Sequence, residues 1–364
     1  MQTATRLASA TLLWLGCALA ALAAASAHAQ VGMASVTFGE LPVTLVYPTA
    51  APTRPVPMGP FTFDVAMNAA PLPGRHPVVA ISHGTGGSVA ADHALAASLA
   101  RAGFVVAQPL HTGDNYRDTR LAGPDAWRKR PVEISQLLDG LGRDARWSGA
   151  VDLTRVGVHG MSAGGTTALA LAGAQWSTLN LVQHCNQYGK EDPGFCFNGA
   201  TQPQQRAERQ ASYDRAKNVP VMFLPADLKV LHGGRTPDAA RPDPRPDPRV
   251  AAVTLMVPVA AIFTPDSLAR IRVPVGVVSA QEDQVLVPRL HSGHVLQHCR
   301  ACTSLADLPK AGHFDVLWPW PPEVAREVAA QQVRGGSPNP EFDPRQREQA
   351  HARLVAFYRQ HLTP

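Results

Sequence analysis

Charged and aromatic side chains are scarce in this sequence, at 17% and 6% of its 364 residues, and it contains no basic run. Lys and Arg number 33 against 28 Asp and Glu, a net charge of +5. So small an excess gives no electrostatic reason to expect nucleic acid as a partner. Both glycine-rich phosphate-binding patterns, G-x-x-x-x-G-K-[ST] and G-x-G-x-x-G after a strand, are also missing, so a nucleotide role is unsupported.

Apolar residues make up 45% of the chain, enough to bury a substantial core. This excludes a disordered or collagen-like protein. The 33 prolines and 29 glycines are scattered between periodic segments, where they are typical of loops rather than of low-complexity sequence. We therefore expect a globular protein.

Residues 1–29 have the pattern of a secretory signal peptide. Arg6 supplies a positive start, Leu7–Ala25 is uncharged and rich in Ala and Leu, and Ala27 to Ala29 form an A-x-A cleavage site. The alternative is a retained membrane anchor, because the uncharged stretch approaches the roughly 20 residues that a span needs. We expect cleavage, no later membrane span, a periplasmic or secreted location, and a single domain over 30–364.

Export changes the interpretation of the cysteines, because thiols in an oxidising compartment tend to pair. Removal of the leader leaves Cys185, Cys196, Cys299 and Cys302, which allow three pairings. Loop closure favours the two short loops, Cys185 with Cys196 and Cys299 with Cys302, although sequence alone leaves the connectivity open. We expect disulfide bonds whichever of the three pairings is formed.

A zinc site is the rival interpretation of the second cysteine pair. His291, His294 and His298 are spaced as on one helical face and lead into Cys299 and Cys302. This spacing matches no standard zinc site, and oxidised cysteines would not bind metal. A solvated helix face carrying histidines is the preferred interpretation, and no metal is expected.

Short apolar runs alternate with helical patterns through most of the chain. The predicted strands are 41–47, 61–67, 78–81, 104–107, 156–158, 251–257 and 273–278, and the predicted helices are 91–102, 132–141, 166–172 and 343–361. The Pro-rich segment 48–60 is expected to be a loop. This alternation predicts an α/β fold whose mostly parallel sheet is buried on both faces by helices.

The alternation is interrupted by a long insertion at about 175–249, far longer than an ordinary connection. It carries two cysteines and a repeated Arg-Pro-Asp-Pro at 241–248, which is typical of an extended linker. Loops of this length are normally lids, binding segments or disordered. We expect an inserted cap or lid over the sheet, with a helix at 204–217.

The most specific local signal is the segment from Val156 to Gly165, in which an apolar run leads into G-x-S-x-G and an Ala-rich helix. Strand, sharp turn and helix are the context that a nucleophile elbow requires. A Cβ at Gly160 or Gly164 would clash where strand and helix cross, and the turn would present the hydroxyl of Ser162 at the positive end of the helix.

A serine needs a base within hydrogen-bond reach and an acid that orients the base. The order Ser, acid, His along the chain directs the search downstream. An acidic pair, Glu282 and Asp283, follows the predicted strand 273–278, and His313 follows a glycine turn. We predict a triad of Ser162, Asp283 and His313, with Glu282 as the alternative acid.

An oxyanion hole needs two backbone N–H donors. One is expected from Ala163, directly after the nucleophile, and the other from the glycine-rich loop after the strand 78–81, where Thr85 is the first choice and Gly86 the second. His111 and Asp114 on the next loop could line the rim of the pocket, although satisfied loop polar groups are the commoner explanation.

These motifs resemble the α/β-hydrolase superfamily, and within it the bacterial predicted dienelactone hydrolase group, which is related to platelet-activating factor acetylhydrolases and polyester-hydrolysing cutinase-like enzymes. The matching segments are VVAISHGTGGS, FVVAQPLHTGDN, RVGVHGMSAGGTTAL, PVGVVSAQEDQVLVP and AGHF. The resemblance implies an α/β-hydrolase fold, with Ser162 as nucleophile, Asp283 as acid, His313 as base, and Thr85 with Ala163 as oxyanion hole.

The chain departs from that pattern at three places. Dienelactone hydrolases carry cysteine as nucleophile, whereas Ser162 stands here, which argues against dienelactone as the substrate. Small Ala163 replaces the aromatic that follows the serine in acetylhydrolase-like elbows, and the insertion at 175–249 matches nothing in the family. These differences leave the substrate undetermined.

The expected function is an exported serine hydrolase that cleaves a small-molecule, lipid or polymer ester through an acyl-enzyme, without a cofactor. A serine peptidase or amidase on the same fold is an alternative, because acyl transfer from amides uses the same groups. A catalytically inactive binding protein is the third hypothesis, although a binding role would not need a complete triad. The sequence does not indicate an oligomeric state.

Overall fold

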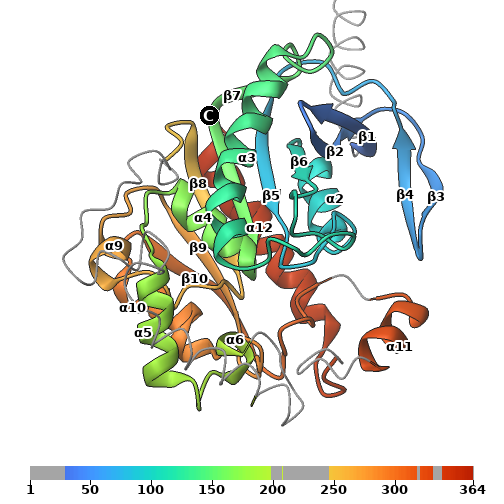
Figure 1. The fold of residues 1–364 in the computed structure, drawn as a ribbon. Coiled ribbons are helices and arrows are strands. Elements are labelled where there is room, and N and C mark those ends of the chain that lie inside the picture. Colours follow the sequence, from blue (N-terminus) through green and yellow to red (C-terminus); the bar gives the residue numbers. More distant parts are fainter. Residues whose placement is uncertain (1–28, 198–206, 208–245, 318–319, 331–337, 364) are drawn as a thin grey trace, which may run out of the picture.

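A computed structural model of the chain describes residues 29–197, 207, 246–317, 320–330 and 338–363. The predicted signal peptide lies outside the described residues, apart from residue 29, and so does the helix predicted at 204–217, apart from residue 207. Figure 1 shows the fold.

Within the described residues, ten strands form one sheet in the order β10-β9-β8-β7-β5-β6-β2-β1-β4-β3. Their bounds are β1 (Gln30–Phe38), β2 (Leu41–Thr49), β3 (Arg54–Met58), β4 (Phe61–Met67), β5 (His76–Ser82), β6 (Val105–Pro109), β7 (Val151–Met161), β8 (Val250–Met256), β9 (Val275–Ala280) and β10 (Cys302–Leu308). The strands from β10 to β6 are parallel, and β2 is antiparallel to β6 and β1. The predicted mostly parallel sheet is confirmed.

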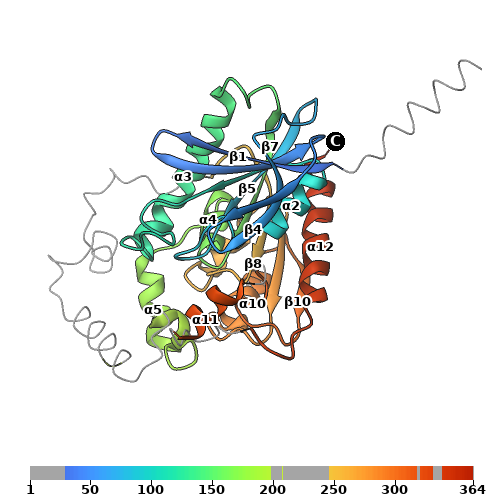
Figure 2. The ribbon, with the colours of Figure 1, turned by 90° about the vertical axis from the view of Figure 1, so that its right-hand side faces the viewer.

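Helices cover both faces of this sheet. The described helices are α2 (His93–Arg101), α3 (Pro124–Arg143), α4 (Ala163–Leu171), α5 (Thr178–Tyr188), α6 (Pro193–Cys196), α9 (Pro265–Ala269), η4 (Pro288–Leu290), α10 (Ser292–His298), α11 (Pro322–Ala330) and α12 (Pro344–Leu362). The apolar residues of α2 and α12 belong to one core cluster, and those of α3, α4, α9 and α10 belong to the other. Figure 2 shows α12 and α2 on one side of the sheet and α3 on the other.

The sequence analysis did not predict β1 or the helices α5, α6, α9 and α11, and three further elements also differ from the predictions. The predicted Pro-rich loop 48–60 contains β3, an edge strand paired with β4 alone, where alternating prolines cost no ladder hydrogen bond. Helix α3 begins at Pro124 and passes through Pro131, so it starts eight residues before the predicted 132. Strand β10 carries no long apolar run, because it lies at the other edge of the sheet and is half exposed.

The chain reverses direction across the sheet between β5 and β7. These neighbours are parallel, but β5 leads to α2 on one face and β7 leads to α4 on the other. Connections that diverge in this way leave a crevice at the carboxyl ends of the two strands, where α/β sheets bind ligands. The glycine-rich loop 83–87 and Ser162 directly follow the carboxyl ends of these two strands.

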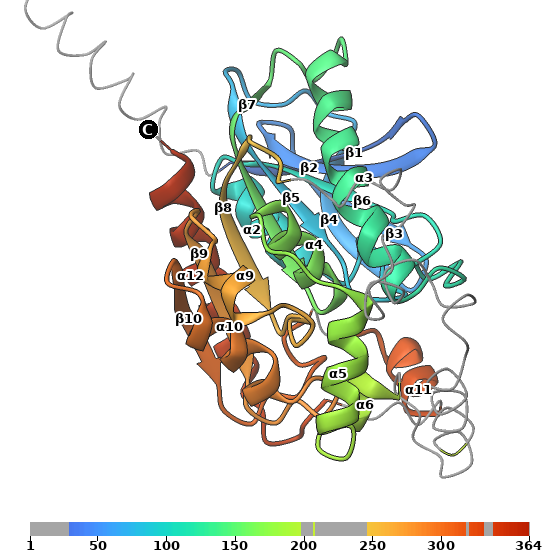
Figure 3. The same ribbon diagram turned by 60° about the vertical axis from the view of Figure 1, so that its left-hand side comes forward.

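The described part of the insertion contributes α5 and α6, which follow α4 in the chain. Figures 1 and 3 show that α5, α6 and α11 gather at the end of the molecule opposite to the C-terminus. None of the helices in the described ranges is long and apolar enough to cross a membrane.

The packing of α12 on β7 can be tested at Gly157. A Cβ there would lie 2.5 Å from the ring of Tyr358, which is fully buried and fixed by a 2.7 Å hydrogen bond to Thr254. Because the ring has no room to move, we expect Gly157→Ala to lower the free energy of unfolding by about 1–3 kcal/mol in urea titrations. Gly149→Ala is the control, since nothing lies within 4 Å of its Cβ. Equal stability of the two variants would contradict the packing described here.

Candidate active site

Ser162 occupies a strained turn between β7, which ends at Met161, and α4, which begins at Ala163. Its φ is +52° and its ψ is −118°, in the left-handed half of backbone space that residues with a Cβ rarely adopt. A Cβ on Gly160 would lie 2.1 Å from the carbonyl oxygen of Gly164, and a Cβ on Gly164 would lie 1.8 Å from that of Ser82. The two glycines are therefore required for strand and helix to cross this closely, as the sequence predicted.

The three residues predicted as a triad lie together in hydrogen-bonded order. Nε2 of His313 is 3.0 Å from Oγ of Ser162, and Nδ1 of His313 is 2.7 Å from Oδ2 of Asp283. Their exposed fractions are 2% for His313, 9% for Ser162 and 6% for Asp283. An ionised carboxylate fixes the Nδ1–H tautomer, which leaves Nε2 free to accept the serine proton.

The carboxylate of Asp283, the predicted acid, is held by backbone groups of its own loop. The other oxygen of Asp283, Oδ1, accepts hydrogen bonds of 2.8 Å from the backbone N–H groups of Val285 and Leu286. With one oxygen held by the backbone, the second oxygen is directed at the imidazole. Glu282, the alternative acid, is exposed and binds Lys310 and Asn339 instead.

The glycine-rich loop lies against the serine. A Cβ on Gly84 would be 3.4 Å from Cβ of Ser162. Gly86, the alternative oxyanion donor, already donates its N–H to Oδ1 of Asp114 at 2.9 Å. Among the described residues, the N–H groups of Thr85 and Ala163 have no protein acceptor. Of the three N–H groups considered as oxyanion donors, those of Thr85 and Ala163 are thus available and that of Gly86 is not.

A buried ion pair holds the glycine-rich loop 83–87 through hydrogen bonds to its backbone. Arg130 and Asp114 are 1% and 0% exposed, and their atoms Nη2 and Oδ2 are 2.8 Å apart. The guanidinium also donates to the carbonyl oxygens of His83 and Gly84, while Asp114 accepts from Gly86. The peptide groups on both sides of Thr85 are therefore fixed by one charged pair, which the sequence analysis missed.

His111 and Asp114 do not line the rim of a pocket, because both are fully buried. His111 bonds Oε2 of Glu133 through Nδ1 at 2.7 Å and Oγ of Ser82 through Nε2 at 2.8 Å. Burial and the nearby charge of Arg130 hold the pKa of His111 well below its usual value. The neutral ring therefore belongs to the polar support beneath the crevice, and the commoner explanation, satisfied loop groups, is correct.

The four cysteines form the two short disulfides, Cys185 with Cys196 and Cys299 with Cys302. Neither sulfur of the second pair is available to a metal. The expected solvated histidine face is wrong for His291, which is 0% exposed and precedes α10 as its N-cap residue. Its Nε2 lies 2.9 Å from Oδ2 of Asp192 in the insertion.

No family model and no curated protein matches the chain. Among solved structures it is similar to a ferulic acid esterase from Streptomyces cinnamoneus, with a TM-score of 0.56 and 17% identity over 93% of this chain and 91% of that one. A dienelactone hydrolase from Anabaena variabilis also matches, with a TM-score of 0.45 and 13% identity over 92% of this chain and 99% of that one. The first similarity confirms the predicted fold class.

The ion pair beneath the glycine-rich loop gives a stability test. Arg130→Met would leave the carboxylate of Asp114 buried without its partner, so we expect the free energy of unfolding to fall by about 3–5 kcal/mol. The control is Lys129→Met, because the side chain of Lys129 is 42% exposed and its Nζ lies as far as 3.6 Å from Oε1 of Glu133. Loss of this exposed ion pair should lower the free energy of unfolding by about 1 kcal/mol or less. Denaturant titration compares them, and a loss for Arg130→Met no larger than the control's would contradict the role given to the pair.

Proposed function

On the α/β-hydrolase fold of this protein, we propose that Ser162, His313 and Asp283 form the catalytic triad of an exported hydrolase of carboxylic esters. The observation that carries the proposal is the unbroken hydrogen-bonded line from Asp283 through His313 to Ser162, with bonds of 2.7 and 3.0 Å. Side chains separated by 30 and 151 positions in the sequence meet in the order that acyl transfer requires.

In the first half of the reaction, Nε2 of His313 takes the proton of Ser162 as Oγ attacks the ester carbonyl. Negative charge develops on the carbonyl oxygen, where the N–H groups of Thr85 and Ala163 donate to it. The imidazolium, stabilised by Asp283, then protonates the departing alcohol and leaves an acyl group on the serine. In the second half, His313 activates a water molecule, which releases the carboxylic acid.

The helix α4 adds to the stabilisation of the oxyanion. Ala163 is its first residue, so its N–H is one of the donors that a helix leaves without an internal acceptor. The positive end of the helix dipole faces the same point. Because these dipoles are fixed before substrate binds, they need no reorganisation as charge develops.

The substrate class is an ester of a small molecule, a lipid or a polymer. The structural neighbour from Streptomyces cinnamoneus is described as a ferulic acid esterase, which supports including aromatic esters in the search. Peptidase or amidase activity is the rival outcome, since amides use the same groups. An inactive binding protein is the other, because such a protein would keep its function without the serine hydroxyl.

A serine-directed fluorophosphonate probe tests the nucleophile. We expect one label per folded chain, located on Ser162 by peptide mass spectrometry, because this hydroxyl has a base within hydrogen-bond reach. Ser162→Ala should lose the label and several orders of magnitude of turnover. Absence of label on the folded wild-type protein would refute the proposal.

A panel of p-nitrophenyl esters of increasing acyl length, with aryl esters and matching p-nitroanilides, then defines the substrate. We expect ester cleavage well above anilide cleavage, because the site provides acyl transfer but no element that is specific for peptides. Faster cleavage of the anilides would favour an amidase. Hydrolysis of short acyl chains alone would weaken the lipid and polymer alternatives together.

We also propose export with removal of residues 1–29, leaving a single domain over 30–364. Two features support this: β1 begins at Gln30, the first residue after the A-x-A site, and two disulfides are present. Intact-mass analysis after expression with the native leader in a Gram-negative bacterium should give a periplasmic chain that begins at Gln30 and carries no free thiol. A full-length chain held in the membrane would contradict this.

A further inference from the structure

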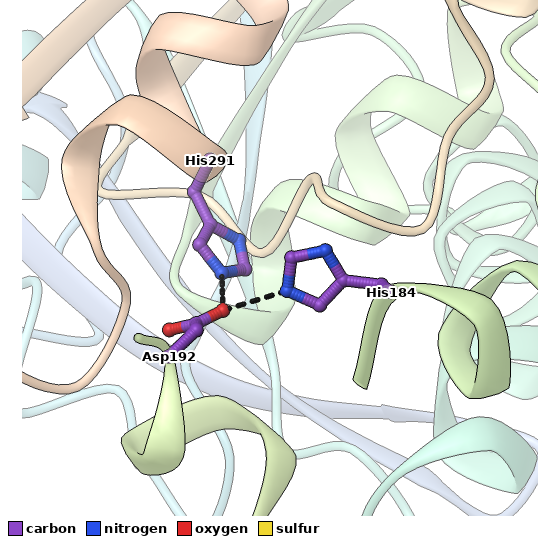
Figure 4. A group of neighbouring side chains, drawn as sticks. All are labelled: His184, Asp192 and His291. Carbon is purple, nitrogen blue, oxygen red and sulfur yellow. Dashed lines mark hydrogen bonds and ion pairs between the residues drawn. The ribbon is translucent and has the colours of Figure 1, made fainter. Parts of the chain in front are cut away.

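A buried polar cluster outside the proposed triad joins the insertion to the main domain. His184 lies on α5, Asp192 immediately precedes α6, and His291 immediately precedes α10. Nε2 of each histidine is 2.9 Å from the same oxygen, Oδ2 of Asp192, as Figure 4 shows. The side chains are between 0% and 6% exposed. The catalytic scheme above uses none of the three.

Two imidazole nitrogens and a carboxylate oxygen within 4.8 Å of one another could hold a metal ion. The hydrogen-bond polarity around His291 argues against that use. Its other nitrogen, Nδ1, accepts the backbone N–H of Ala260 at 3.1 Å, so the proton of the neutral ring must sit on Nε2. A metal ligand has the reverse arrangement, with a lone pair toward the metal and the distal N–H donating outward. The cluster is therefore a hydrogen-bonded one.

The carboxylate at its centre is ionised. Burial, the largest single influence, would raise the pKa of Asp192, but the hydrogen bonds from His184 and His291 outweigh it and lower the pKa to about 2. The remaining oxygen, Oδ1, accepts the backbone N–H of Val287 at 3.3 Å. The carboxylate of Asp192 thus accepts hydrogen bonds both from the insertion and from the chain after β9.

The chain after β9 is the loop that carries Asp283. It supplies Val285 and Leu286, whose N–H groups donate to Asp283, and then Val287, whose N–H donates to Asp192 instead. Gly194 of α6 packs directly on this loop, because a Cβ there would lie 2.5 Å from the carbonyl oxygen of Val285. The insertion therefore contacts the loop 281–287, here called the acid loop, at Val285 and Val287.

The two insertion members of the cluster are also tied to each other. The disulfide between Cys185 and Cys196 joins α5 to α6, and each cysteine lies close in sequence to a cluster residue. The N–H of Cys196 donates to the carbonyl oxygen of Asp192 at 3.0 Å. The disulfide and this hydrogen bond therefore hold His184 and Asp192 together where they contact His291 and Val287.

We propose that Asp192, hydrogen-bonded to His184 and His291, is a positioning residue that holds the acid loop in the conformation that directs Asp283 at His313. This inference rests on the proposed function. It gives the insertion a part in catalysis besides any covering of the site: a buried charge in the insertion fixes the third member of the triad.

The test is Asp192→Asn, which keeps the shape of the side chain but directs an amide toward donors. We expect kcat on the best p-nitrophenyl ester to fall about 10- to 100-fold, as for a small misplacement of a reacting group, with KM changed less than about twofold. The matched control is Glu191→Gln at the neighbouring position, which removes an exposed ion pair with Arg289 of η4 and should leave kcat unchanged. Equal kcat for Asp192→Asn and wild type would overturn the inference.

A double-mutant cycle with Asp283→Asn separates positioning from general loss of structure. If Asp192 acts through Asp283, adding Asp192→Asn to the Asp283→Asn enzyme should lower kcat by less than about twofold. Full multiplication of the two effects would show that Asp192 acts elsewhere, and so contradict the inference. Failure of the wild type to hydrolyse esters or accept the fluorophosphonate would instead remove the proposed function, so the two failures are distinguishable.

Two further measurements keep the inference testable if Asp192→Asn does not fold. His184→Gln keeps an N–H donor near the position of Nε2, whereas His184→Leu does not, so the Gln variant should retain more of the wild-type kcat than the Leu variant. Equal losses would contradict the role of the hydrogen bond. Equilibrium dialysis against zinc followed by elemental analysis should give less than stoichiometric metal; one zinc per chain that is lost in His291→Asn would overturn the inference in favour of a metal site.

Discussion

The close crossing of β7 and α4 at Ser162 is the constraint on which the rest of the site depends. It forces the serine backbone to φ +52° and leaves no room for a Cβ at Gly160 or Gly164. In return, Oγ stands clear of the sheet and the adjacent Ala163 N–H projects from the end of a helix. Three other loops bring the proposed base, the proposed acid and the second proposed oxyanion donor to this point.

Buried charges outside the motifs hold those loops in place. On the oxyanion side, Arg130 and Asp114 fix the peptide groups that flank Thr85. On the acid side, Asp192 collects backbone and imidazole donors beneath the loop of Asp283. A buried charge without its partners would be costly at either place. The partners of each charge therefore favour one conformation of the loop that they hold. Preorganisation of this kind is what the stabilisation of a developing oxyanion requires.

The sequence predicted what short patterns encode and missed what only folding assembles. The elbow around Ser162 has a local steric signature, and chain order led from it to Asp283 and His313. No pattern links Arg130 to the glycine-rich loop 47 positions earlier, or His291 to Asp192 99 positions away, because these pairings depend on which helices pack together. The choice of Thr85 over Gly86 likewise follows from an acceptor on another loop. An exposed edge strand with alternating prolines and a helix that passes through Pro131 both ran against local propensity, and tertiary packing decided them.

The central claim is that Ser162 carries the acyl group during turnover, and trapping that species tests it most directly. The protein is mixed with a p-nitrophenyl ester, quenched in acid within the first turnover, and analysed by intact mass and peptide mapping. The account predicts a burst of up to one equivalent of p-nitrophenol, and a mass increase equal to the acyl group on the peptide that contains Ser162. Ester hydrolysis in which no acylated protein forms at any quench time, or in which the acyl group maps to another residue, would contradict it.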